Sequence, residues 1–215
     1  MRRSIFVRLA LAMACLAFLG AGCRAAKAPV EGPHGSLAVA PFTQPLMDSE
    51  LLAGFIPEEA VAVKPVVLGG LDAVLAEELG KGLAAQYQRP AEVRQCMQIQ
   101  LSANDGKRRT ALESWLEVGR CLGVDYLLVP QLMLWGERDG SEIAVRRPAA
   151  VILDLYLVDV KAEGLAARYH FDEAQLSLTE NILDADKFVK RKGKWITATE
   201  LAREGLARGV KEFGL

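Results

Sequence analysis

The spacing of apolar residues along the chain marks where strands and helices are expected. Residues 37–42, Leu-Ala-Val-Ala-Pro-Phe, have the pattern of a short buried strand that a proline ends. From Val67 to Tyr87, apolar residues recur every three or four positions, which predicts an amphipathic helix. Arg89-Pro90 is expected to stop this helix, and a strand is expected over Glu92–Leu101.

Three capping boxes, each a Ser or Thr followed three residues later by Glu, predict the starts of further helices. They are Thr110 with Glu113, Ser177 with Glu180, and Thr197 with Glu200. The first helix should end at Leu122, because Gly123 can supply the left-handed cap. The other two should form a pair of C-terminal helices, over about 178–191 and 198–213.

Between the first and second boxes the pattern is that of strands. Residues 126–135 are almost continuously apolar, and 150–160 alternate, with Leu155 on one face and Asp154 on the other. A third antiparallel strand is expected over 165–174. Pro130 lacks an N–H, so it should lie at a sheet edge or a bulge. The order of elements predicts one α/β (α+β) domain over 36–215, a mixed sheet of about five strands with helices packed on it.

The N-terminus has the pattern of an export signal. Residues 1–8 hold three arginines and no acid, an apolar stretch follows over 9–19, and small residues precede Cys23. This resembles the lipobox of bacterial lipoproteins, which implies a signal peptide over 1–22 and lipidation of Cys23 by chains such as palmitate. Gly20 stands where those proteins usually have a large aliphatic residue, so simple cleavage near Gly22 and an uncleaved anchor remain alternatives.

Two further features follow from the lipobox pattern. Arg24, rather than Asp, follows the cysteine, and by the rule for enteric lipoproteins this implies the periplasmic face of the outer membrane. Residues 23–35 are rich in Pro and Gly and should form a flexible tether. Two or three acyl chains hold a protein on a membrane effectively permanently, so the lipid is the expected membrane contact.

Composition narrows the chemistry. The 215 residues include 26 Lys and Arg against 27 Asp and Glu, a net charge of −1, so nucleic acid is not an expected partner. The pair Cys96 and Cys121 could form a disulfide in an oxidising compartment or remain as two buried thiols. Their spacing matches neither a redox nor a zinc pattern.

No catalytic, cofactor or metal site is expected. His170, Asp172 and Glu173 supply too few ligands for a metal, and no nucleophile elbow, dinucleotide fingerprint or phosphate loop occurs. An enzyme with a small-molecule substrate is therefore not predicted. The basic segment 187–194 could contact an anionic surface, although a helix C-terminus favours the same charges.

The connection Gln44–Ala62 is the strongest candidate for a contact with a partner. It spans about twenty residues where connections usually have about 4–6, and long ordered loops tend to be functional. Four of its apolar residues are candidates for partner binding: Leu51, Leu52, Phe55 and Ile56. The same residues could instead pack on their own domain, and the sequence leaves both readings open.

Two segments carry a resemblance to a known group of proteins. Leu122-Gly-Val-Asp-Tyr-Leu-Leu-Val and the strand that ends in Leu157-Val-Asp-Val, together with the lipobox, resemble the superfamily of CsgG, LpoB and the TolB N-terminal domain. The resemblance covers about residues 36–175 and implies an anticodon-binding-domain-like fold. It implies a module that binds another envelope protein or itself, in assembly or regulation. The alternative is a CsgG-like secretion-pore or secretion-complex subunit.

Overall fold

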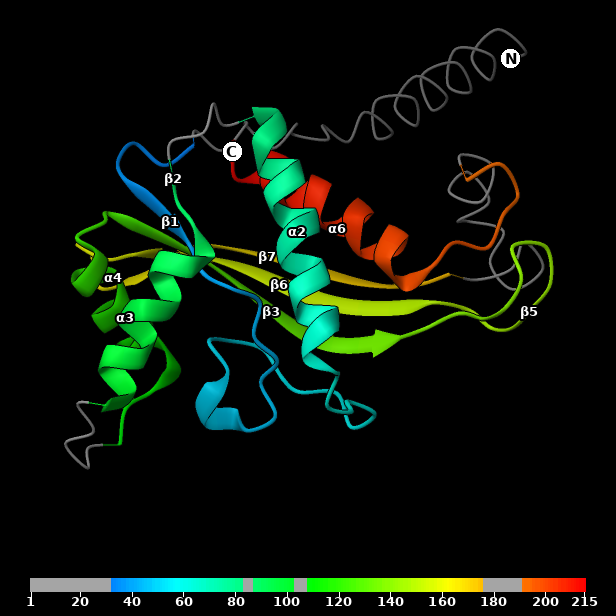
Figure 1. Ribbon diagram of the computed structural model, residues 1–215, viewed down its shortest axis with the longest axis horizontal. Helices are drawn as coiled ribbons and strands as arrows, with labels where there is room; N and C mark the ends of the chain where they lie inside the picture. Colours follow the sequence, from blue (N-terminus) through cyan, green and yellow to red (C-terminus); the bar gives the residue numbers. More distant parts are fainter. Residues whose placement is uncertain (1–31, 83–86, 103–107, 176–190) are drawn as a thin grey trace, which may run out of the picture.

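A five-stranded mixed sheet forms the centre of the molecule in the computed structural model, which describes residues 32–82, 87–102, 108–175 and 191–215 (Figure 1). In spatial order its strands are β2 (Tyr87–Gln88), β1 (Leu37–Val39), β3 (Tyr126–Gly136), β6 (Ala150–Asp159) and β7 (Gly164–Ala174). β1 is parallel to both β2 and β3, whereas β6 and β7 are antiparallel to their neighbours. The mixed sheet with packed helices that the sequence predicts is confirmed.

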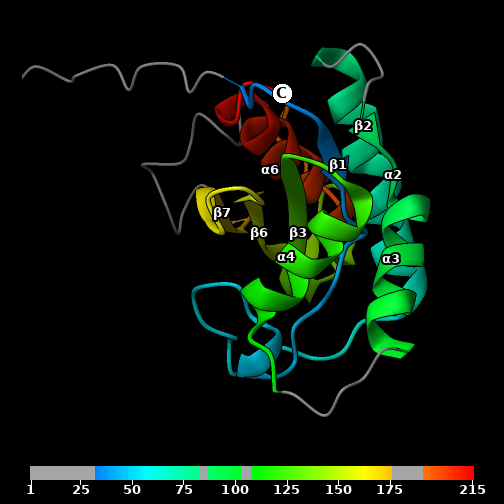
Figure 2. The ribbon, with the colours of Figure 1, turned by 90° about the vertical axis from the view of Figure 1, so that its left-hand side faces the viewer.

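Helices cover both faces of this sheet. α2 (Pro65–Gly82) and α6 (Ala198–Glu212) lie side by side over one face, where they enclose the larger apolar core. α3 (Pro90–Ser102) and α4 (Ala111–Leu122) pack on the other face with a second core (Figure 2). The architecture is therefore a layered α+β domain.

The alternation predicted for β6 decides which core each side chain enters. Leu153 and Leu155 belong to the core beneath α2 and α6, whereas Tyr156 belongs to the core beneath α3 and α4. Successive side chains of a strand point to opposite faces, so one strand contributes to both cores. All three side chains are fully buried.

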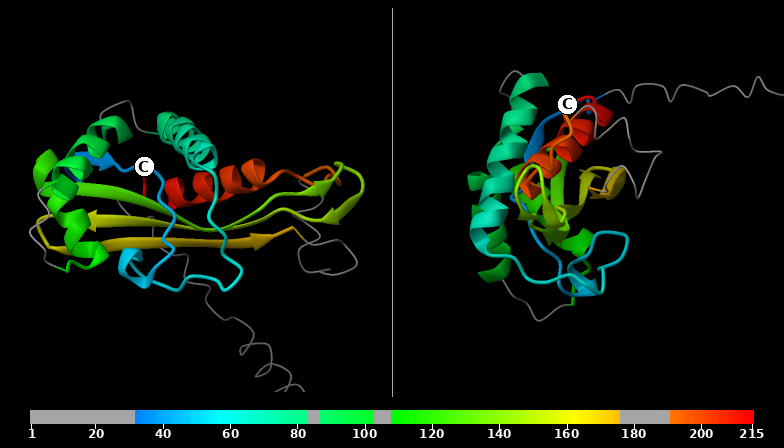
Figure 3. Two further views of the ribbon diagram at one scale, coloured as in Figure 1. Left: turned by 60° about the horizontal axis from the view of Figure 1, so that its bottom comes forward. Right: turned by 90° about the vertical axis from the view of Figure 1, so that its right-hand side faces the viewer.

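The long strands extend to one end of the molecule. There the small hairpin of β4 (Asp139–Gly140) and β5 (Val145–Arg147) continues from β3 and leads back into β6 (Figure 3). Gly32, the first described residue, lies against Gly214, near the C-terminus. A Cβ built on Gly32 would lie 2.5 Å from the carbonyl oxygen of Gly214. Both ends of the described domain therefore lie together.

The helix caps expected from the sequence form as predicted in two of three cases. The Thr110 hydroxyl accepts from the backbone N–H of Glu113, whose carboxylate accepts from the N–H of Thr110, and α4 ends at Gly123 with a φ of 67°. Thr197 and Glu200 make the same reciprocal pair at the start of α6. The box of Ser177 and Glu180, and with it most of the first expected C-terminal helix, lies outside the described residues.

The strand expected over Glu92–Leu101 is wrong, because this segment is helix α3. Pro90 is its first residue, where a missing N–H does no harm and a fixed φ favours the helix. The Glu92 carboxylate accepts from the backbone N–H of Arg89, which satisfies another donor at this helix start. The proline therefore opens α3, α2 already ends at Gly82, and Tyr87 lies in strand β2.

Pro130 lies within the central strand β3 and not at a sheet edge or a bulge as expected. It pairs with Leu155 of β6, and its own carbonyl accepts from the N–H of Thr43. The backbone nitrogen of Pro130 points toward the side of β3 on which β1 lies. β1 ends at Val39, and the chain pairs with β3 again only through the bridge of Thr43 with Gln131. The proline thus sits beside an interruption in the neighbouring strand.

Among the residues that the structure describes, no helix has the length and apolar content needed to cross a membrane.

Candidate functional site

The connection between β1 and α2 is held at both of its ends by one side chain. The Gln44 amide nitrogen donates to the carbonyl of Val61 at 2.9 Å, and its oxygen accepts from the N–H of Val63 at 2.8 Å. A single amide therefore closes the loop into a compact unit. Within it, a turn of 3-10 helix, η1 (Asp48–Glu50), shapes the middle of the first half.

A second amide fixes the connection to the sheet. Gln131 of β3 is buried, and its nitrogen donates to the carbonyl of Glu50 at 2.9 Å while its oxygen accepts from the N–H of Leu52 at 3.3 Å. Both halves of the buried amide are therefore satisfied by loop backbone. The Glu50 carboxylate in turn accepts from the N–H of Leu46 at 2.9 Å, so the turn is braced from both sides.

The next residues of the connection, Ala53 and Gly54, lie against Tyr156 and Arg168. The Tyr156 hydroxyl donates to the carbonyl of Ala53, and burial, followed by the nearby Asp154 carboxylate, raises the pKa of this phenol. Gly54 has a φ of 98°, and a Cβ there would lie 2.5 Å from a terminal nitrogen of Arg168. The loop backbone therefore fits against the guanidinium closely, and only glycine meets both requirements.

These anchors place the four predicted partner-binding residues in two different environments. Leu52 packs against the core beneath α3 and α4, and Leu51 and Ile56 are half-buried. Phe55 points outward, with 68% of its surface exposed. The connection therefore packs on its own domain through Leu52 and exposes a large aromatic side chain, Phe55, to solvent.

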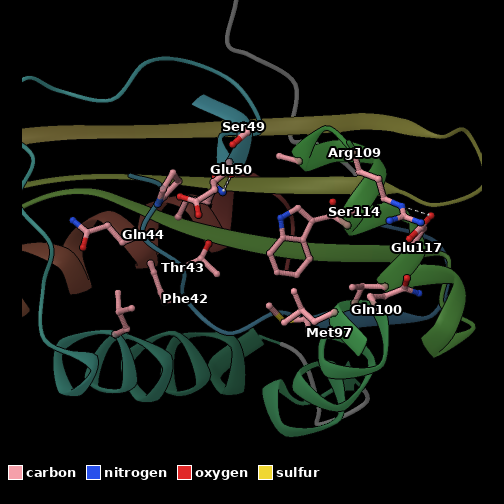
Figure 4. A pocket seen from close by; sticks show the side chains of 17 residues that line it. Phe42, Thr43, Gln44, Ser49, Glu50, Met97, Gln100, Arg109, Ser114 and Glu117 are labelled. Atoms are coloured by element: carbon pink, nitrogen blue, oxygen red, sulfur yellow. Dashed lines mark hydrogen bonds and ion pairs between the residues drawn. The ribbon is translucent and has the colours of Figure 1, made fainter. Parts of the chain in front are cut away.

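A cavity of about 720 Å³ lies beside the first half of the connection (Figure 4). Phe42, Thr43 and Gln44 approach it from the sheet side, with Met97 of α3 and Ser114 of α4 opposite. The apolar part of its lining consists of Phe42, Pro45, Leu68, Met97, Leu101, Ala111, Trp115 and Val118. The polar part consists of Thr43, Gln44, Ser49, Glu50, Gln100, Arg109, Ser114, Glu117 and Gln131.

The walls of this cavity are joined to one another. The structure links Cys96 of α3 to Cys121 of α4 by a disulfide, with the two Cα atoms 6.0 Å apart. On the other side, Asp72 of α2 accepts from the backbone N–H of Phe42 at 2.7 Å and from Arg94 of α3 at 2.6 Å. Burial raises the pKa of Asp72 despite these partners. Three helices and the end of β1 are thus fixed around the same space.

The other sites considered from the sequence are structural where they are described. Asp154 accepts from Arg168, and His170 Nδ1 lies 3.0 Å from one of its oxygens, so this histidine is a partner of the buried Asp154 carboxylate. No group of three or more metal-ligating side chains occurs in residues 32–82, 87–102, 108–175 and 191–215. Cys23 lies outside these ranges.

The structure describes residues 191–194 of the basic segment 187–194. Residues 187–190 lie outside the described ranges, whereas Arg191 is buried in ion pairs with Glu173 at 2.6 Å and Glu204 at 2.7 Å. Lys194 pairs with Glu142 of the hairpin at 2.7 Å. These two cations therefore join the segment to its own domain.

Two of these features escaped the sequence analysis. The cavity is formed by residues from three helices and a loop, and no local pattern reveals such a space. Gln131 and Asp154 did leave a signal, since each is a single polar residue within an apolar strand. A buried polar side chain needs a partner, and here the partners are the connection and β7.

No protein family matches the chain by sequence, and no curated protein does either. Among solved structures, a PelC dodecamer from Paraburkholderia phytofirmans is 13% identical with a TM-score of 0.46, over 86% of this chain and 93% of that chain. A lipoprotein, GNA1162, from Neisseria meningitidis is 15% identical with a TM-score of 0.35, over 74% and 97%. A hypothetical protein from Chlamydia trachomatis is 12% identical with a TM-score of 0.39, over 85% and 98%. Every one of these TM-scores is below 0.5, so we infer no function for this chain from these structures.

Proposed function

We propose that this chain is a lipid-anchored lipoprotein on the periplasmic face of the outer membrane, where it binds another envelope protein or a second copy of itself. The lipobox pattern that ends at Cys23 supports the anchor, and Arg24 supports the outer membrane. The resemblance to the superfamily of CsgG, LpoB and the TolB N-terminal domain supports a role in assembly or regulation. The proposed role is binding and not catalysis.

The observation that carries the binding role is the exposure of Phe55 on an anchored loop. Neighbouring residues of the connection are fixed by Gln131 and by Tyr156, so the aromatic side chain is presented from a defined backbone. Met47, on the same connection, is also more than half exposed. Large apolar side chains on a preformed surface are typical anchors of protein interfaces, because little conformational entropy is lost when they bind.

Chemical crosslinking in intact cells tests this proposal with three variants of the full chain. Phe55→Asp should keep the melting temperature and lose the crosslinked complex, since Phe55 contributes its exposed ring to a partner and little to its own core. Ile143→Asp is the matched control, because Ile143 is 87% exposed at the distant hairpin and should leave the complex intact. Leu52→Asp should lower the melting temperature, because Leu52 packs on the core.

If Phe55→Asp folds and keeps the complex, the connection is not the interface and the proposal fails. The mass of the purified chain in detergent distinguishes the two kinds of assembly. A monomer or dimer supports the binding module, whereas a ring of many copies favours the secretion-complex subunit. A dodecamer is the assembly stated for the PelC protein, and here it is only a possible result of the measurement.

A further inference from the structure

We propose that the cavity beside the connection is a binding site for an uncharged single-chain amphiphile, an alkyl chain that carries one hydroxyl or carbonyl group. The volume of about 720 Å³ falls in the range of about 300–1,000 Å³ that is usual for small-molecule sites. Large apolar side chains make up much of its lining, including Trp115, Met97 and Phe42. An alkyl chain is the kind of group that such walls take from water.

The charged groups of the lining disfavour a ligand with a carboxylate. Arg109 and Glu117 form an ion pair at 2.9 Å, and the Glu50 carboxylate accepts from the backbone N–H groups of Leu46 and Met47. These are the three charged side chains among the described lining residues, and each is engaged within the protein. A carboxylate entering here would lose its hydration without gaining a free counter-charge, which is strongly unfavourable.

Two of the three glutamine amides of the lining, Gln44 and Gln131, already bind the backbone of the connection. Gln44 uses its nitrogen and its oxygen to close the connection, and Gln131 uses both of its atoms to hold Glu50 and Leu52. These bonds fix the orientation of both amide groups. Because most of the lining is apolar, the cavity favours a ligand with few hydrogen-bonding groups.

One hydroxyl in the lining has no partner among the described residues. Thr43 Oγ1 is buried and makes no hydrogen bond there, although Thr43 itself lines the cavity between Phe42 and Gln44 (Figure 4). A rotation of about 120° at χ1, from one staggered well to another, moves the hydroxyl to the position that the methyl group now holds. A single hydroxyl or carbonyl on the ligand would satisfy Oγ1, whose unpaired burial is otherwise unfavourable.

The site is preformed. The disulfide between Cys96 and Cys121 joins the two helices of one wall, and Asp72 joins Phe42 of the opposite wall to Arg94. Because these links hold the walls in place without a ligand, binding requires little ordering of the protein.

Photolabelling of the intact chain in its own membranes tests the proposal. The probe is a long-chain primary alcohol with a diazirine in its alkyl chain and an alkyne for detection, compared with the fatty acid of the same chain. The labelled peptides should come from α3, from α4 and from residues 42–50. The fatty acid should label these peptides about tenfold less, because its carboxylate finds no counter-charge. Equal labelling by the two probes, or labels confined to other peptides, would overturn the proposal.

Two pairs of variants locate the site. Gln100→Trp fills the cavity and should abolish labelling of these peptides, whereas Gln98→Trp on the same helix does not line the cavity and should leave labelling unchanged. Thr43→Val should lower labelling about two- to tenfold, the effect expected for one lost hydrogen bond, without lowering the melting temperature. Ser141→Ala, at the distant hairpin, controls for loss of a hydroxyl elsewhere. Unchanged labelling of folded Gln100→Trp refutes the site, and unchanged labelling of Thr43→Val refutes the assigned hydrogen bond.

Discussion

Arg168 of β7 and Asp154 of β6 form a two-bond ion pair: two of the three guanidinium nitrogens, Nε and Nη2, donate to the two carboxylate oxygens at 3.0 and 3.2 Å. The Asp154 side chain is 1% exposed and that of Arg168 is 35% exposed. The guanidinium also lies over the ring of Tyr156, 5.6 Å from its centre, and against Gly54 of the connection. One side chain therefore neutralises a buried charge and supports the loop that carries Phe55.

Arg168→Ala should destabilise the protein, because it leaves the buried Asp154 carboxylate without its guanidinium partner. Removal of one partner from a fully buried pair costs about 3–5 kcal/mol, and partial exposure of Arg168 reduces this to roughly 2–3 kcal/mol. Denaturant unfolding measures the loss. In the double variant with Asp154→Asn the loss should be smaller than the sum of the single losses, and simple additivity would contradict the pairing.

Replacement of Cys96 and Cys121 by alanine should lower the free energy of unfolding. The disulfide closes a loop with a sequence separation of 25, for which the loss of chain entropy predicts about 3.5 kcal/mol. The measurement is denaturant unfolding of both proteins, with and without reductant. Reductant should destabilise only the original chain, and detection of two free thiols at these positions in the native protein would refute the bridge.

Asp125 should make the fold sensitive to acid. Hydrogen bonds from Lys161 and from the backbone and hydroxyl of Ser36 hold the pKa of its carboxyl far below the ordinary value of 3.8. A lowered pKa in the folded state contributes stability that is complete above the unfolded value and is lost as pH falls through the folded value. The stability advantage over Asp125→Asn should therefore be constant near neutral pH and shrink below about pH 4.

Unfolding curves of the two proteins between pH 7 and pH 2 test this expectation. Glu113→Gln provides a comparison, because hydrogen bonds from Thr110 lower the pKa of Glu113 at a different place, the start of α4. An advantage over Asp125→Asn that grows as the pH falls would be inconsistent with the bonds to Ser36 and Lys161.

Cys23→Ala should prevent lipidation and release the protein from the membrane. One acyl chain binds marginally and several bind effectively permanently, so loss of all chains should shift nearly all of the protein to the soluble fraction. Metabolic labelling with an alkyne analogue of palmitate and fractionation after a carbonate wash measure both effects. Cys15→Ala, within the apolar stretch, is the matched control and should keep its label. A Cys23→Ala protein that remains in the washed membrane would argue against the lipobox.

The parts of the fold that depend on local signals were predictable from the sequence. The capping boxes at Thr110 and Thr197 form as expected, because a hydroxyl and a carboxylate three residues apart satisfy each other's backbone donors. The alternation expected over 150–160 is confirmed, because Leu155 and Tyr156 lie in cores on opposite faces of the sheet. Such signals lie within a few residues of one another, and no distant contact overrides them.

The wrong prediction for residues 92–101 arose because a proline can either follow a helix or begin one. Pro90 can follow a helix or begin one, and the choice depends on whether Val93 and Cys96 pack on the sheet. The connection presented a similar ambiguity, because Leu52 and Phe55 look alike in sequence and differ only in which anchor lies beside them. The cavity could not be predicted, since it depends on how three helices and a loop fail to fill the space between them.

The contact of Gly32 with Gly214 brings the two ends of the described domain next to each other. A short linker could join the two ends without crossing the core, and new ends could be opened at the turn around Ser141, where the hairpin of β4 and β5 stands away from the helices. Such a circular permutant would carry its tether at the opposite end of the same fold. A membrane anchor attached there would invert the orientation of the domain and turn the natural distal hairpin toward the bilayer.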